Sequence, residues 1–202
     1  MNRDATELKT NSQGNMRYTF VIYVEDKPGV LNRVASLFRR RAFNIESLTV
    51  GHSETSGVSR MTVLVELDVQ GAKRLEANLY KLVNVLRVHN ISAEPSVFRE
   101  LAMVKVATKT QDIRTSVMQL ANVFRGRVVD VGTDSVILET TGTEDKIEGL
   151  LEVLRPYGIL ELTRTGRIGM VRGSRSVVVE APESFSSKRS ESTEDDNISY
   201  SV

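Results

Sequence analysis

The hydrophobic residues of this chain change their spacing in a fixed order, and the same order occurs twice. Alternation typical of a strand gives way to the i, i+4, i+7 spacing of a helix, then to two strands, a second helix and a last strand. The first round covers residues 17–95 and the second covers residues 96–173. This order is typical of ferredoxin-like domains, in which two helices cover one face of an antiparallel sheet. We therefore predict an α+β fold with two tandem βαββαβ units.

The first unit contains a short turn where its first strand meets its first helix. Residues 18–24 alternate as a strand, and Asp26-Lys27-Pro28-Gly29 has turn composition. Apolar residues then recur at helical spacing up to three arginines, which suit a helix C-terminus. The remaining elements are predicted at residues 45–50 (strand), 60–67 (strand), 75–83 (helix) and 85–91 (strand). Leu75, Leu79, Leu82 and Val83 are expected to form the apolar stripe of the second helix.

The second unit repeats the pattern, with a hairpin about Gly132 and Asp134. Its strands are predicted at residues 101–107, 128–131, 136–139 and 159–162, and its helices at residues 113–124 and 147–154. Thr143 is the expected N-cap of the second helix, with Glu144 and Asp145 in a first turn that favours negative charge. Because units this small leave a sheet face or edge uncovered, we expect pairing between units and between chains.

The two ends of the chain differ from the repeated region. We predict a flexible leader at residues 1–16, which lacks the hydrophobic core of a signal peptide, and a disordered tail at residues 174–202, which is acidic and rich in serine. The tail is either a solvated extension without a specific role or a regulatory segment. No stretch reaches the roughly 18 consecutive apolar residues of a membrane span. We expect a cytoplasmic protein with no membrane partner.

Composition disfavours several classes of function. A net charge of +1 gives no strongly basic surface, and the predicted strand at residues 59–65 has no aromatic residue on which a base could stack, so no nucleic-acid partner is expected. The chain has no cysteine, which excludes thiolate metal sites and cysteine nucleophiles. His52 and His89 are expected to be exposed or hydrogen-bonded structural residues. We expect neither an active site nor a metal site in this chain.

The segment from Asp26 to Leu31 is the strongest candidate site. The first N–H groups of a helix, here from Gly29 to Leu31, lack intrahelical acceptors and suit a carboxylate. Asp26 at the strand end offers a charge-assisted hydrogen bond to an ammonium group. Such a pair of sites fits the backbone groups of a free amino acid. The residues alone favour the simpler interpretation, a turn that merely starts a helix.

Longer segments resemble a known family. VEDKPGVLNRVASLFRRRAFNIESLTVG, SRMTVLVELD and LYKLVNVLRV in the first unit, with RELAMVKV and FRGRVVDV in the second, are similar to the regulatory (small) subunits of acetolactate synthase, also called acetohydroxyacid synthase. The resemblance covers about residues 17–173. It implies that the first unit is an ACT domain, the amino-acid-sensing module of that family, and that the second is an ACT-like relative.

The resemblance also implies a function and a set of site residues. Such a subunit is not catalytic. It binds a separate catalytic subunit that uses thiamine diphosphate, magnesium and FAD, raises its activity, and confers feedback inhibition by valine or another branched-chain amino acid. The effector site forms between the ACT domains of a homodimer. Carried onto this chain, the effector-binding residues are Asp26, Gly29, Val30 and Leu31 of one chain with Asn44 and Ile45 of the other.

One departure from the family concerns the candidate loop. Many bacterial members carry asparagine at the position of Asp26, and small polar residues at that of Pro28. The added negative charge favours the ammonium group of an effector and repels its carboxylate, so the choice of effector stays open. The competing functions are a free-standing amino-acid sensor or transcriptional regulator, for which the sequence shows no helix-turn-helix pattern, and a small enzyme such as a phosphatase, for which histidine, arginine and asparagine do not converge in one loop.

Overall fold

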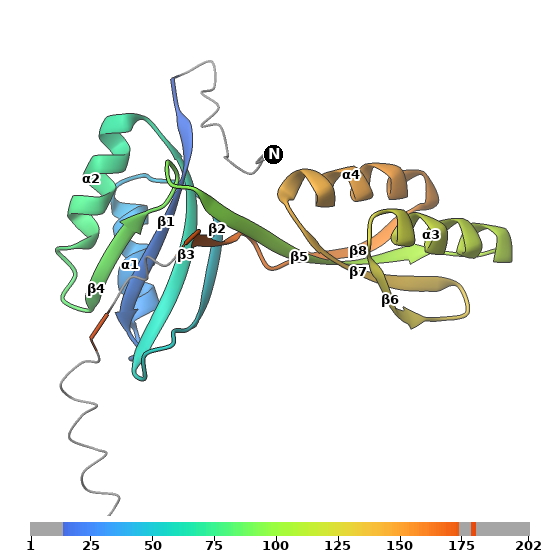
Figure 1. Cartoon of the computed structure of the whole chain (residues 1–202), viewed down its shortest axis with the longest axis horizontal. Coiled ribbons are helices and arrows are strands. Elements are labelled where there is room, and N and C mark those ends of the chain that lie inside the picture. The colour runs from blue at the N-terminus through green and yellow to red at the C-terminus, as the bar shows by residue number, and fades with distance from the viewer. Residues whose placement is uncertain (1–13, 174–178, 181–202) are drawn as a thin grey trace, which may run out of the picture. The chain divides into compact units, whose positions relative to one another are not determined.

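The computed structural model describes residues 14–173, 179 and 180, and it divides into two compact units (Figure 1). The first unit consists of the described residues up to Pro95 and from Val171 onward, and the second consists of Ser96–Met170. Each unit is built on an antiparallel sheet in the βαββαβ order, which confirms the predicted fold class. The predicted leader up to residue 13, and the predicted tail apart from residues 179 and 180, lie outside the described residues.

The first unit has the strand order β2-β3-β1-β4 (Figure 1). Strand β1 is central and pairs antiparallel with both β3 and β4, so β2 and β4 are the edges. The bounds are β1 (Met16–Glu25), α1 (Val30–Arg40), β2 (Ile45–His52), β3 (Val58–Leu67), α2 (Val69–Leu79) and β4 (Val85–Asn90). Four residues therefore separate the end of the central strand from the start of α1, in the loop singled out by its sequence.

The core of the first unit lies between the sheet and its two helices. Alternate residues of β1 pack there against the buried stripe of α1, which consists of Val30, Val34, Leu37 and Phe38, as its spacing predicted. Arg39 and Arg40 occupy the last turn of α1, where positive charge is favourable. Because Val30 is 4% exposed, the first turn of α1 is held to the core directly after the loop.

Helix α2 begins and ends earlier than its predicted stripe. It begins after Asp68, whose side chain accepts a hydrogen bond from the N–H of Gly71 at 2.6 Å, and it ends at Leu79. Turns replace the helix over the next residues, so the helical spacing no longer applies. Leu82 still packs against the core, but Val83 is 90% exposed, and its assignment to the stripe is wrong.

The second unit has the strand order β6-β7-β5-β8, and β9 also pairs with β5. Its elements are β5 (Ser96–Ala107), α3 (Gln111–Val123), β6 (Arg127–Val131), β7 (Ser135–Gly142), α4 (Glu144–Leu154), a 3₁₀ turn (Arg155–Tyr157), β8 (Ile159–Arg164) and β9 (Ile168–Val171). Strand β5 starts five residues earlier than predicted, and β9 was not predicted. Four residues that include a glycine carry too little periodicity to indicate a strand, so only pairing with β5 reveals β9.

The helices of the second unit confirm most of their predicted features. Val117 and Ala121 of α3 and four residues of α4 are buried against the sheet; the α4 residues are Ile147, Leu150, Leu151 and Leu154. Thr110 caps α3 by accepting from the N–H of Ile113 at 3.3 Å. Thr143 occupies the N-cap position of α4 as predicted, but its side chain makes no capping hydrogen bond.

Candidate functional site

The loop between β1 and α1 leaves the N-terminus of the helix open. Gly29 holds the N-cap position with φ of 82°, in the left-handed region that glycine adopts without steric cost, and no side chain caps the helix. The N–H of Val30 donates to the carbonyl of Lys27 at 3.3 Å, while no described residue accepts from the N–H of Gly29 or Leu31. A Cβ atom built on Gly29 would meet no atom within 4 Å. The space beside Gly29 is therefore open, and the two N–H groups without an acceptor offer partial positive charge to an anion.

Asp26 is held in place by the hairpin between β2 and β3. Its N–H donates to the carbonyl of Gly57 at 2.8 Å, and its Oδ1 accepts from the Ser59 hydroxyl at 3.1 Å. Its Oδ2 lies 3.2 Å from Nδ1 of His52, a largely exposed side chain. Both carboxylate oxygens thus already have polar partners, and Asp26 is still 43% exposed. An ammonium group would add to these contacts or displace His52.

Glu25 links the other side of the loop to the α2–β4 connection. Its N–H donates to the carbonyl of Asn84 at 2.9 Å, and its Oε2 accepts from Nδ2 of Asn84 at 2.5 Å and lies 3.2 Å from Nζ of Lys27. Arg33, in the first turn of α1, donates to Oδ1 of Asn84 at 3.0 Å. The hydrogen bond from Asn84, helped by Lys27, lowers the pKa of Glu25 despite the opposing effect of burial.

Sequence reasoning did not identify the contacts of Glu25. Asn84 lies 59 residues away, and only the pairing of β1 with β4 brings it to the loop. The loop is therefore anchored on both sides, by Ser59 and His52 at Asp26 and by Asn84 at Glu25. This anchoring fixes the position of the open helix N-terminus without filling it.

The two apolar residues predicted for the site play different roles. Val30 is buried and belongs to the core, so only its backbone borders the loop. Leu31 is 44% exposed at the first turn of α1. It is the one of the two whose side chain is available to an apolar group bound beside Gly29.

The structure does not bring Asn44 and Ile45 to the loop of the same chain. They lie just before and at the start of β2, beyond the C-terminus of α1, and the 11 residues of that helix separate them from the loop by about 16 Å. Asn44 is exposed, and Ile45 packs partly against the core. Because β2 is an edge strand, both residues lie at a border of the sheet that a second chain can reach.

His89 and the acidic side chains of the described residues form no second site beside the loop between β1 and α1. His89 on β4 lies 2.5 Å from Oε1 of Glu94 through its Nε2, as a half-buried, hydrogen-bonded side chain. Among residues 14–173, 179 and 180, there is no group of three or more histidine, cysteine, aspartate or glutamate side chains that could hold a metal ion. Within the same residues, helices with the length and apolarity needed to cross a membrane are absent.

Each of the two units matches a known protein family. Residues 20–87 match the family described as "AHAS small subunit-like ACT domain", so the first unit, with its open loop at the start of α1, is an ACT domain. Residues 99–173 match the family described as "Small subunit of acetolactate synthase". The two matches together cover both units.

Whole-chain relatives agree with the two family matches. The chain is 48% identical over 160 residues to the "Probable acetolactate synthase small subunit" of Archaeoglobus fulgidus, which covers 79% of this chain and 99% of the relative. It is 44% identical over 166 residues to the "Acetolactate synthase small subunit" of Mycolicibacterium smegmatis, with 82% and 97% covered. The crystal structure of the acetolactate synthase small subunit from Thermotoga maritima superimposes with a TM-score of 0.73 at 36% identity and covers 79% of this chain and 99% of that one. The chain belongs to the family of acetolactate synthase small subunits.

Proposed function

We propose that this chain is the regulatory subunit of a cytoplasmic acetolactate synthase, and that it binds and activates a catalytic subunit and makes that subunit sensitive to valine. The observation that carries the proposal is the similarity to acetolactate synthase small subunits over both units. The chain contributes no catalytic group in this proposal. Thiamine diphosphate, magnesium and FAD belong to the catalytic subunit, as the family resemblance implies.

The open end of α1 supports an amino-acid effector. The free N–H groups of Gly29 and Leu31 suit the effector carboxylate, and the exposed Leu31 side chain suits a branched apolar group. Asp26, at the end of β1, is placed to receive the ammonium group. Valine combines these three features. Leucine and isoleucine share them and are the next effectors to test.

We propose that the site is completed across a homodimer of ACT domains. Asn44 and Ile45 lie about 16 Å from the loop of their own chain, across the length of α1, so they join a loop only when it belongs to a second chain. An effector bound by both chains stabilises one relative orientation of the two domains. A coupling free energy of about 1–3 kcal/mol between this orientation and the catalytic subunit is enough for feedback control.

The test is acetolactate formation from pyruvate by the cognate catalytic subunit, with and without this chain, across a valine titration. We expect stimulation by the chain, followed by inhibition as valine rises. Stimulation without a valine response would keep the partner and make leucine and isoleucine the next effectors to test. No effect, with both proteins folded, would contradict the proposal and favour a free-standing amino-acid sensor.

A further inference from the structure

His52 and Ser59 lie opposite each other in the β2–β3 hairpin, and both contact Asp26. They are directly paired across the two strands. The Ser59 hydroxyl donates to Oδ1 of Asp26 at 3.1 Å, and Nδ1 of His52 lies 3.2 Å from Oδ2. Each oxygen of the carboxylate therefore has one partner, and both partners come from the same hairpin.

Backbone hydrogen bonds fix the hairpin beside the loop. The N–H of Asp26 donates to the carbonyl of Gly57 at 2.8 Å, and the N–H of Ser53 donates to the carbonyl of Val58 at 2.9 Å. Val58 is buried and pairs with the end of β1. Strand pairing thus holds the backbone of His52 near that of Asp26, although the imidazole is 86% exposed.

The positively charged groups around Asp26 are used elsewhere. Lys27 in the loop lies 3.2 Å from the carboxylate of Glu25. Arg33 of α1 donates to the α2–β4 connection. Arg60 follows Ser59 on β3, so its side chain points to the other face of the sheet, where it lies over an aromatic ring of β1. Among the described residues, His52 alone forms an ion pair with Asp26.

The nearest other acids do not compete with Asp26 for His52. Glu54 lies in the β2–β3 loop, and Glu180 follows Val179, whose carbonyl accepts from the Thr55 hydroxyl at 3.2 Å. Both glutamates are exposed, and neither pairs with His52. A change in the charge of His52 is therefore felt first at Asp26.

A protonated imidazole and an ammonium group are alternative donors to the same carboxylate. Histidine is the side chain whose charge ordinarily changes between about pH 5 and pH 8. When it is protonated, His52 forms an ion pair with Asp26 and repels a second cation; when it is neutral, the repulsion is absent. The carboxylate of Asp26 therefore becomes more available to an ammonium group as the pH rises.

We propose that His52 determines how readily Asp26 accepts the ammonium group of the effector, and that protonation of His52 weakens effector binding. This inference rests on the proposed amino-acid site in the loop between β1 and α1, and it adds a residue and a pH response to that site. Because exposed ion pairs are weak, the effect is moderate. We expect the affinity for valine to be about two- to fivefold lower at about pH 6 than at about pH 8.

Calorimetric titration of the full chain with valine at these two pH values tests the proposal. His52→Gln is uncharged and His52→Lys is charged at both values, so the first should bind equally well at both and the second equally weakly. The exposed side chain makes both variants compatible with the fold. By linkage, valine binding near pH 6 should release protons from the unmodified chain, measured as a buffer-dependent heat, and this release should be absent from both variants.

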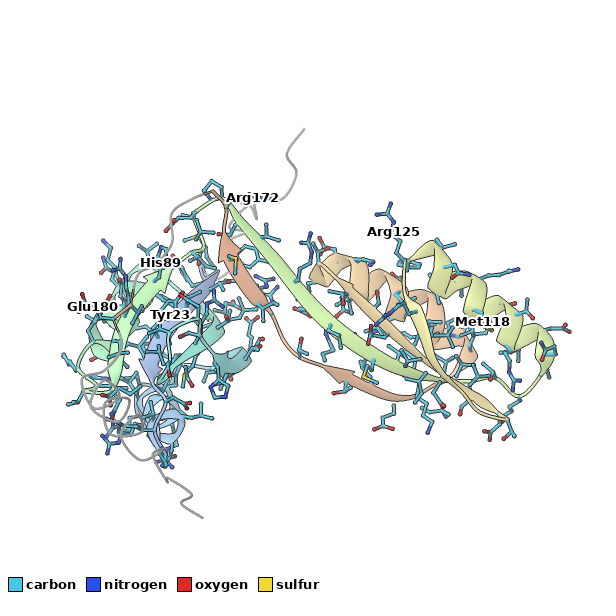
Figure 2. The ribbon with its side chains drawn as sticks, turned by 60° about the horizontal axis from the view of Figure 1, so that its bottom comes forward. Tyr23, His89, Met118, Arg125, Arg172 and Glu180 are labelled. Carbon is cyan, nitrogen blue, oxygen red and sulfur yellow. The ribbon has the colours of Figure 1, made fainter. Side chains whose placement is uncertain are left out.

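The matched control is His89→Gln, at the other of the two histidines in the chain. Figure 2 shows His89 on β4, which is the edge strand opposite to β2. Its Nε2 lies 2.5 Å from Oε1 of Glu94, so it also pairs with a carboxylate, but away from the loop. This variant should keep the pH dependence of valine binding and the proton release.

Two failures of the experiment have different meanings. A pH dependence that persists in His52→Gln, or that His89→Gln removes equally, would overturn the role of His52 and leave the effector site in place. Absence of binding of valine, leucine and isoleucine at both pH values would contradict the proposed effector site itself, and this inference with it.

Discussion

At the scale of single residues, the proposed carboxylate site depends on Gly29. It has a left-handed backbone with open space beside it, and the N–H groups of Gly29 and Leu31 at the start of α1 have no acceptor among the described residues. Asparagine and aspartate tolerate this conformation better than other residues with a side chain. Substitution by either therefore tests the site at a similar cost in stability of about 1 kcal/mol.

We predict that Gly29→Asp abolishes valine inhibition and leaves activation of the catalytic subunit intact. The added carboxylate lies where the effector carboxylate is proposed to bind, and two like charges repel each other. Gly29→Asn is the matched control, with the same size and backbone demand but no charge. Valine titrations of both holoenzymes should show at least a tenfold larger effect of Asp, or about 1.4 kcal/mol. Equal sensitivity of the two variants to valine would show that the effector carboxylate does not bind in this loop.

Glu25 gives the first unit a predictable response to acid. Because the hydrogen bond from Asn84 lowers the pKa of Glu25 below its ordinary value of 4.5, the ionised form stabilises the folded state. This contribution is present above pH 4.5 and is lost as the pH falls from 4.5 through the lowered pKa. We predict that Glu25→Gln flattens the acid side of the stability curve, measured by thermal unfolding between about pH 3 and pH 7. Glu54→Gln, at an exposed residue of the β2–β3 loop, should leave the curve as in the unmodified chain.

At the scale of secondary-structure elements, the helix N-termini differ in how they are capped. Asp68 caps α2 through a 2.6 Å hydrogen bond from Gly71, whereas Thr143 occupies the same position before α4 without such a bond. Both residues are suitable N-caps by type, so composition does not separate them. The difference depends on side-chain conformation in the folded chain.

We predict that Asp68→Ala lowers the free energy of unfolding by about 1 kcal/mol, because the N–H of Gly71 loses its acceptor. Thr143→Ala should change it by less than about 0.5 kcal/mol, since no capping bond is lost. Urea unfolding of both variants under one set of conditions measures the difference. A larger loss in Thr143→Ala than in Asp68→Ala would contradict these cap assignments.

At the scale of the whole molecule, the proposed effector site needs two chains. The loop at Gly29 and the residue Asn44 lie at opposite ends of α1, so each homodimer would contain two sites that each combine both chains. Two variants that damage different halves of the site should therefore complement each other in a mixed dimer.

We predict that Gly29→Asp and Asn44→Ala each reduce valine inhibition when present in both chains, and that mixing the two variants partly restores it. In the mixed dimer, one site combines the intact loop of the Asn44→Ala chain with the intact Asn44 of the Gly29→Asp chain. The valine response of the reconstituted holoenzyme, measured after subunit exchange, reports this directly. If mixing restores nothing although the chains exchange, the two halves do not meet across a dimer.

Local patterns along the chain were sufficient to predict the order of elements, the fold class and the candidate loop. These follow from local periodicity and turn chemistry, as in the buried stripe of α1 and the turn that ends at Gly29. The homology of both units was also readable, because similarity to a family is a property of the sequence. Local patterns were less informative where a helix ended early, as at Val83, and where a strand as short as β9 depended on its partner.

The contacts between side chains that lie far apart along the chain could not be predicted in this way. The pairing of β1 with β4 brings Asn84 to Glu25, and the β2–β3 hairpin brings His52 and Ser59 to Asp26. Contacts of this kind depend on sheet register and on the path of each loop, neither of which has a local signature in the residues involved.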